Sequence, residues 1–182
     1  YRERQKEIDK LNEDLDIRIL SGTEVEIDSD GKLDLPDSLL EDLDFVIASI
    51  HSGFKQNEEK ITNRIISAIN NDNVDAIGHP TGRLLLKRDP YEINLGKIYE
   101  AAEENDVALE INSFPSRLDL PDIEIKKAKQ YDIKFSLGTD SHNREHLRFM
   151  EFGIANARRG WLGENDVLNT MNLGEIEDYL GL

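Results

Sequence analysis

Residues 45–50, FVIASI, form a continuous apolar run of strand length that leads directly into His51. Such a run is typical of a strand buried on both faces, as in a parallel sheet. Further strand-like segments follow or precede it at regular intervals, at residues 17–27, 74–78, 107–111 and 133–137. The sequence therefore predicts about five strands.

Helical patterns separate these strands. They cover residues 1–15, 36–42, 58–70, 94–104, 122–131 and 144–158, with shorter helices near 164–170 and 174–180. Strands that alternate with helices of this length predict βα units, a parallel sheet and the α/β fold class. A doubly wound open sheet and part of a (β/α) barrel both fit. No glycine-rich phosphate loop follows any strand, so the barrel is favoured.

Composition limits the functions that the chain can have. With 182 residues, it has the size of one domain, residues 1–182. The 38 acidic and 22 basic residues give a net charge of −16, so we expect no strong non-specific DNA binding by the chain alone, and part of the acidity can serve divalent cations. There is no cysteine and no apolar run of the roughly 20 residues that a membrane helix needs. We expect a cytoplasmic protein without a membrane partner.

Imidazoles and carboxylates fall where predicted strands end. His51 and His79 directly follow two strands, Asp140 and His142 follow the last one, and Glu24 lies inside the first. Because the carboxyl ends of barrel strands form one face, we expect these side chains to converge there. Borderline divalent metals prefer this ligand set. The pattern predicts a metal site.

Each residue also has a structural interpretation. A single histidine can be a hydrogen-bonded core residue, and strand parity does not choose between Glu24 and Glu26. Asp140 can be a helix N-cap. His146 lies one helical turn after His142 without a zinc-protease motif, so we interpret it as a surface or supporting residue.

Two arginines lie on loops after strands, Arg83 in HPTGRLL and Arg117 in SRLDL. Guanidinium groups can bind phosphate oxygens in bidentate fashion, so both are candidate phosphate ligands. A surface salt bridge is the alternative for each.

The segments GTEVEI, SIHSGF, GHPTGR, EINSFPSRLDLPD and GTDSHNREHLRFM follow one another in this chain. Together they resemble the PHP (polymerase and histidinol phosphatase) family, in particular the PHP domain attached to family X DNA polymerases. The resemblance implies a distorted (β/α)7 TIM-like barrel with up to three divalent metal ions, zinc or manganese, with magnesium as a further option.

By this resemblance, the metal ligands are Glu24, His51, His79, Asp140 and His142. Glu24 is similar to a carboxylate that bridges two metals, and Asp140 to one that completes the coordination and accepts a proton, so these two carboxylates are the expected catalytic residues. Asn112 falls at a rim position whose residue type varies in the family.

PHP barrels begin with a strand that carries His-x-His, and no such motif occurs here. The resemblance therefore implies that the first strands, about half of the ligands and a polymerase domain lie outside this chain, which starts at Tyr1. We expect the isolated chain to be inactive and its open strand edges to permit oligomerisation.

The activity implied for the intact protein is 3′–5′ exonuclease hydrolysis of phosphodiesters, with DNA bound mainly by the polymerase domains. The alternatives are a histidinol-phosphatase-like phosphomonoesterase and a non-catalytic PHP module. An amidohydrolase-type barrel also combines histidines with an aspartate, but the pairing of Asp140 with His142 favours PHP.

Overall fold

The structure is a computed structural model that describes all residues from Tyr1 to Leu182. Five parallel strands form one sheet in the order β1-β2-β3-β4-β5. The strands are β1 (Gly22–Glu26), β2 (Phe45–Ser49), β3 (Ala76–Ile77), β4 (Ala108–Asn112) and β5 (Phe135–Gly138). The spatial order equals the chain order and never reverses, whereas a doubly wound sheet has a reversal point. The wall of a partial barrel is the architecture that this order fits, as predicted.

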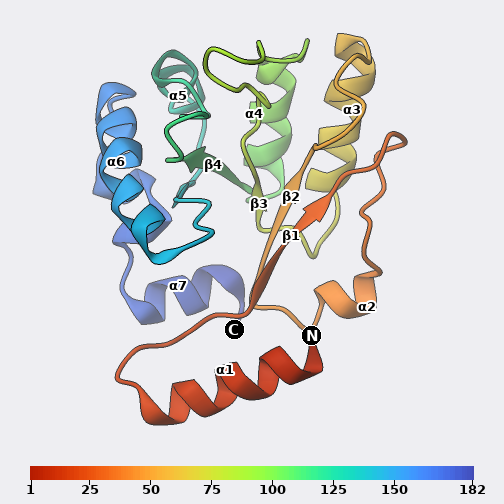
Figure 1. Cartoon of the computed structure of the whole chain (residues 1–182). Coiled ribbons are helices and arrows are strands. Elements are labelled where there is room, and N and C mark those ends of the chain that lie inside the picture. The colour runs from red at the N-terminus through yellow and green to blue at the C-terminus, as the bar shows by residue number, and fades with distance from the viewer.

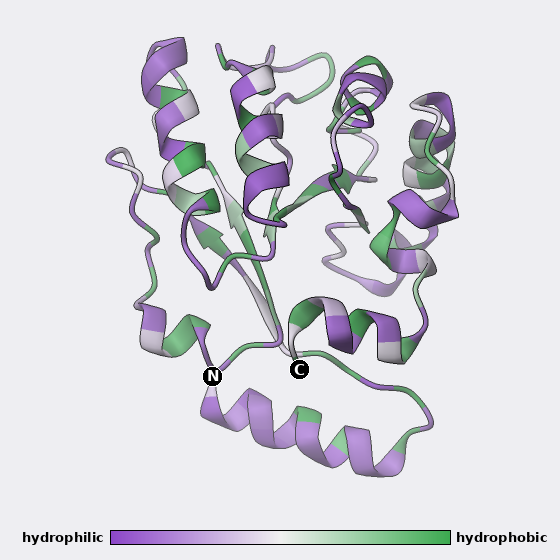
Figure 2. Ribbon diagram, turned by 180° about the vertical axis from the view of Figure 1, so that it is seen from behind, coloured by the Kyte–Doolittle hydropathy of each residue, from purple (hydrophilic) through white to green (hydrophobic).

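Helices stand in a row beside the sheet in both views (Figures 1 and 2). This row consists of α3 (Glu58–Ile69), α4 (Leu95–Glu104), α5 (Asp122–Ala128) and α6 (Met150–Arg159). The remaining helices are α1 (Arg2–Asp14), α2 (Asp37–Leu40) and α7 (Leu173–Leu180), with short 3-10 helices at Arg144–Phe149, Glu164–Asp166 and Leu168–Thr170. No helix combines the length and the hydropathy needed to span a bilayer.

The two faces of the sheet differ in character. Val25, Val46, Ala48, Leu109 and Ile111 belong to a cluster of 28 buried residues, which the sheet shares with helices of the row. Because neighbouring residues of a strand point to opposite faces, the alternate positions lie on the other face. The C-terminal segment covers its lower part, where Leu168, Ile176 and Tyr179 pack against β2, β3 and β4. On this second face, polar side chains occupy the carboxyl ends of the strands.

Helix α1 lies apart from the row, near the amino ends of the strands (Figure 1). None of its residues is buried, and it is mostly hydrophilic (Figure 2). It attaches to the sheet through Arg4, which donates a hydrogen bond to the Gly22 carbonyl at 3.1 Å, and through the Tyr1 hydroxyl, 3.1 Å from that of Thr23.

Several predicted elements differ from the observed ones in their bounds, and local contacts explain two of these differences. The first strand begins at Gly22 instead of residue 17, because the Asn12 side chain binds both the N–H and the carbonyl of Ile19, at 2.6 and 3.0 Å, and keeps that residue out of the sheet. The helix predicted at 144–158 opens as a 3-10 turn. There the His146 amide bonds the Asn143 carbonyl in the tighter i to i+3 pattern, and the α-helix starts at Met150.

The two open edges of the sheet are β1 and β5. On β1, the Gly22 carbonyl accepts from Arg4, and the Glu26 carbonyl accepts from the Asp34 amide at 3.0 Å. These contacts engage two backbone carbonyls of β1.

Candidate metal site

Three side chains from three neighbouring segments converge at the carboxyl end of the sheet. Glu24 projects from β1, His51 lies two residues after the end of β2, and His79 lies two residues after the end of β3. Glu24 Oε1 lies 3.2 Å from His51 Nε2 and 3.0 Å from His79 Nε2, and the two imidazole nitrogens are 3.2 Å apart. The sheet register brings together three of the five residues that the sequence predicted to converge.

The triangle has the size that one cation requires. Ligand atoms at about 2.0–2.1 Å from a tetrahedral zinc ion lie roughly 3.3 Å from one another. The three observed separations of 3.0 to 3.2 Å are close to this value. Two imidazoles and a carboxylate are also a common donor set for such ions. The group of Glu24, His51 and His79 can therefore hold a divalent metal ion.

Glu26 orients the first histidine. Its Oε2 lies 2.8 Å from His51 Nδ1 and accepts a hydrogen bond from the His51 amide at 2.9 Å, while its Oε1 accepts from the Ser52 hydroxyl at 2.7 Å. A carboxylate on Nδ1 favours the tautomer that carries its proton there, so the Nε2 lone pair points to the other two ligands. Glu24 and Glu26 lie on the same face of β1, but Glu24 contacts both imidazole Nε2 atoms and Glu26 contacts only His51 Nδ1 and the loop after it. The alternation of residues along the strand could not distinguish these two roles.

The charges of the triangle support one another. The hydrogen bond with His51, followed by that with His79, holds the pKa of Glu24 well below its usual range. In turn, Glu24 first and Glu26 second raise the pKa of His51 against the opposing effect of burial. The carboxylate is thus ionised, as a metal ligand must be.

A buried carboxyl group, Glu110, lies beneath the site. It projects from the middle of β4, and its Oε2 accepts a hydrogen bond from the His79 amide at 2.7 Å. Burial raises its pKa to about 8. Gly138 on β5 makes room for it, because a Cβ there would lie 2.5 Å from Glu110 Oε1. The carboxyl group fixes the backbone of His79, whose φ of 29° lies in the left-handed region.

Asp140 and His142 lie outside the triangle. They follow β5 on a turn where Asp140 has a φ of 50° and the His142 ring is largely exposed, with Nδ1 2.8 Å from the Asp140 carbonyl oxygen. Asp140 is not a helix N-cap, since Asn143 caps the following 3-10 helix. His146 supports this turn, because its Nδ1 accepts from the His142 amide at 3.2 Å.

The two arginines have different partners. Arg83 donates to the backbone carbonyls of Arg117, at 3.0 Å, and of Leu118, so it ties two loops together. The Arg117 guanidinium lies beside Asp140, with Nε 3.8 Å from a carboxylate oxygen, and its buried Nη1 has no partner. Arg117 is therefore the better placed of the two for an anion.

Asn112 is buried at the end of β4. Its amide nitrogen lies 3.4 Å from both Glu110 oxygens, and its oxygen accepts from the Phe114 amide at 3.0 Å. These contacts support Glu110 and the loop after β4.

The sequence prediction had selected neither Glu26 nor Glu110. The signals were present: Glu26 lies two residues after Glu24, and Glu110 is an acidic residue inside an apolar strand.

The fold and the site define the class of this protein. It is an α/β protein with a candidate metal site at the carboxyl ends of its parallel strands. Comparison with curated proteins identifies the family within the class. The chain is 43% identical over 180 residues to DNA polymerase/3′-5′ exonuclease PolX of Bacillus subtilis, covering 98% of this chain and 32% of that protein.

Probable phosphatases are also similar. One from Thermoanaerobacter sp. (strain X514) is 37% identical over 174 residues, 90% of this chain and 68% of the relative. One from Clostridium acetobutylicum is 33% identical over 136 residues, 70% of this chain and 53% of the relative. No protein-family model matches the chain. The chain belongs to the PHP family, and it spans about a third of the length of the Bacillus relative.

Proposed function

We propose that this chain is the C-terminal portion of a PHP barrel and that the intact protein hydrolyses phosphodiesters in the manner of a 3′–5′ exonuclease. The observation that carries the proposal is the triangle of Glu24, His51 and His79, with ligand atoms 3.0 to 3.2 Å apart. The name of the Bacillus relative, which combines a DNA polymerase with a 3′-5′ exonuclease, supports this substrate class. DNA would then be held mainly by domains outside this acidic chain.

The residues divide the task. A bound divalent ion supplies charge for the phosphoryl group and lowers the pKa of a bound water. His51 and His79 hold the ion through Nε2. Glu24 contacts both imidazoles through Oε1 and would supply the carboxylate ligand.

Asp140 and His142, on the turn after β5, would serve as further ligands of the bound ions, and Asp140 would accept the proton of the attacking water. Arg117 lies against Asp140 and has a free guanidinium nitrogen. We assign Arg117 to a phosphate oxygen, because a guanidinium binds phosphate with two parallel hydrogen bonds. Arg83 and Asn112 act by shaping the loops that carry these groups.

A phosphomonoesterase is the second candidate, supported by the relatives named probable phosphatases. The higher identity to the Bacillus protein, 43% against 37%, favours the phosphodiesterase. Against a non-catalytic module stands the convergence of three ligand side chains, Glu24, His51 and His79, on one point.

The test is metal analysis with exonuclease and phosphomonoesterase assays on the full-length gene product and on this chain alone. We expect bound divalent metal, release of nucleotides from a single-stranded oligonucleotide, and loss of that activity with a chelator. Asp140→Ala and Glu24→Gln should abolish it, whereas Glu3→Gln on the exposed helix α1 should not. The isolated chain should be inactive. Hydrolysis that persists with a chelator, or in the Asp140→Ala protein, would refute the mechanism.

A further inference from the structure

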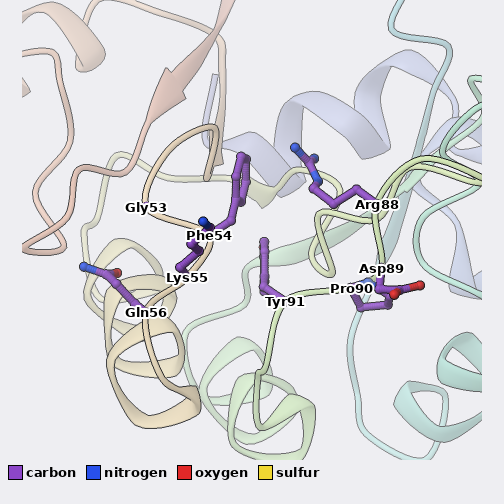
Figure 3. A pocket seen from close by; sticks show the side chains of 8 residues that line it. All are labelled: Gly53, Phe54, Lys55, Gln56, Arg88, Asp89, Pro90 and Tyr91. Atoms are coloured by element: carbon purple, nitrogen blue, oxygen red, sulfur yellow. The ribbon is translucent and has the colours of Figure 1, made fainter.

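A pocket opens between two loops that each begin at a histidine of the candidate metal site. One loop runs from His51 after β2, and the other runs from His79 after β3. Residues 53–56 of the first and 88–91 of the second line the pocket (Figure 3). Its volume of about 1020 Å³ is at the upper end of the roughly 300–1,000 Å³ of typical ligand sites. None of these residues takes part in the metal triangle.

The pocket has an aromatic wall. Phe54 and Tyr91 face each other nearly in parallel, with ring centroids 6.1 Å apart and planes at 14°. Phe54 is only partly buried, while the Tyr91 hydroxyl is anchored to the Pro80 carbonyl at 2.9 Å. Tyr91 thus forms a fixed base, and Phe54 presents the aromatic surface that a ligand can reach.

A guanidinium completes the wall. The Arg88 Cζ atom lies 4.0 Å from the centroid of the Phe54 ring, and two of its nitrogens donate to the Gly82 carbonyl at 2.9 and 2.6 Å. The contact leaves no room for a base between Arg88 and Phe54, so a ligand would stack on their outer surfaces. Both aromatic rings and guanidinium planes are stacking surfaces for nucleobases.

Positive charge gathers here in an otherwise acidic chain. Lys55 and Arg88 line the pocket from its two loops together with one acidic residue, Asp89, and Lys87 directly precedes Arg88 in the chain. Phosphate groups of a strand are attracted to such cationic side chains. A plain apolar ligand would gain nothing from these charges, whereas a strand of nucleotides uses both the aromatic surface and the cations.

We infer that this pocket binds a nucleobase of the phosphodiester strand next to the phosphate that is hydrolysed, with Phe54 and Arg88 as the stacking surface. The inference rests on the proposed function and adds to it a subsite that selects nucleic acid over small phosphomonoesters. Stacking is tolerant of sequence because every base has a π-face. The subsite should therefore bind a strand with any base at this position more tightly than a strand that lacks the base.

The test compares two six-nucleotide single strands, one normal and one whose last two bases are replaced by abasic tetrahydrofuran units. Binding to the full-length protein is measured by fluorescence anisotropy with a chelator present, and hydrolysis is measured with divalent metal. We expect the normal strand to bind roughly 5- to 150-fold more tightly and to have a correspondingly lower KM. Phe54→Leu, which keeps apolar packing against Tyr91, should remove the difference.

Two further variants serve as controls. Phe54→Tyr keeps the ring and should retain the preference, and Leu86→Ala, on the same loop as Arg88 but fully exposed and outside the pocket, should behave as the wild type. Equal binding of the two strands by the wild type would overturn the inference. So would an equal loss for both strands in Phe54→Leu, since Phe54 would then only position the histidine loops. Absence of hydrolysis would contradict the proposed function alone, and the anisotropy difference would still decide the subsite.

Discussion

The two ends of the sheet carry similar residue types with different duties. At the amino ends, Asp44 and Asp75 each precede a strand and accept hydrogen bonds from the Ser21 and Val46 amides, at 2.5 and 2.6 Å. At the carboxyl ends, Glu24, His51 and His79 converge on one another. The aspartates at the amino ends satisfy backbone amides, whereas the side chains at the carboxyl ends present metal-ligand atoms close to one another. Strand direction, more than residue type, therefore separates structural from functional polar groups.

The largest effect should come from removing the carboxylate of the triangle. Glu24→Gln takes away the charge that both imidazoles contact, so we expect the affinity for zinc to fall by more than about 100-fold, beyond what loss of a supporting group costs. Competition with a chelating dye measures it, with Glu3→Gln as the matched control. An unchanged affinity would mean that the triangle is not the metal site, and the contrast between the two ends would disappear.

The amino end should respond in stability instead. Burial raises the pKa of Asp75 from 3.8 to about 6. The folded state thus binds this proton more tightly than the unfolded state, and the free energy of unfolding should fall as the pH rises from about 4 to 6. One pKa unit is worth 1.36 kcal/mol, and since Asp75 is only partly buried, solvent screening lowers the total to about 1–2 kcal/mol.

The matching variant is Asp75→Asn, which keeps an acceptor for the Val46 amide but cannot ionise. Above pH 6, it should be more stable than the wild type by up to this amount and should lack the decline from Asp75. Urea unfolding of this chain at several pH values, followed by the fluorescence of its single tryptophan, Trp161, measures both. The metal affinity of Asp75→Asn should equal that of the wild type. A large change would show that the amino and carboxyl ends of the sheet are not independent.

A smaller effect should follow from Glu26→Gln. The amide oxygen can still accept from the His51 backbone or ring, but as a neutral acceptor it favours the proton on Nδ1 less strongly, so the Nε2 lone pair is less available. We expect about a 10-fold loss of zinc affinity, the lower end for supporting groups. The dye competition assay checks it. A loss as large as that of Glu24→Gln would assign Glu26 to direct metal binding.

Sequence reasoning located the five strands because buried strands follow a periodic pattern, whereas the resemblance to the PHP family, and not strand parity, selected Glu24 over Glu26. The apolar runs located the five strands, and parallel pairing then placed Glu24, His51 and His79 at one end. It did not select Glu110, whose role depends on the close approach of Gly138. Nor could it position the turn of Asp140 and His142, because the left-handed backbone there is set by local contacts rather than by a repeating pattern.

Within this chain taken alone, Glu24 belongs to an edge strand, which has a neighbour on one side only. Edge strands fray more readily than interior ones, since fewer backbone bonds hold them. An ion shared by Glu24, His51 and His79 would join this strand to the segments after β2 and β3 without any added backbone pairing. Loading the site would therefore also act as a cross-link, and local opening of the edge would become rarer in proportion to the occupancy of the ion.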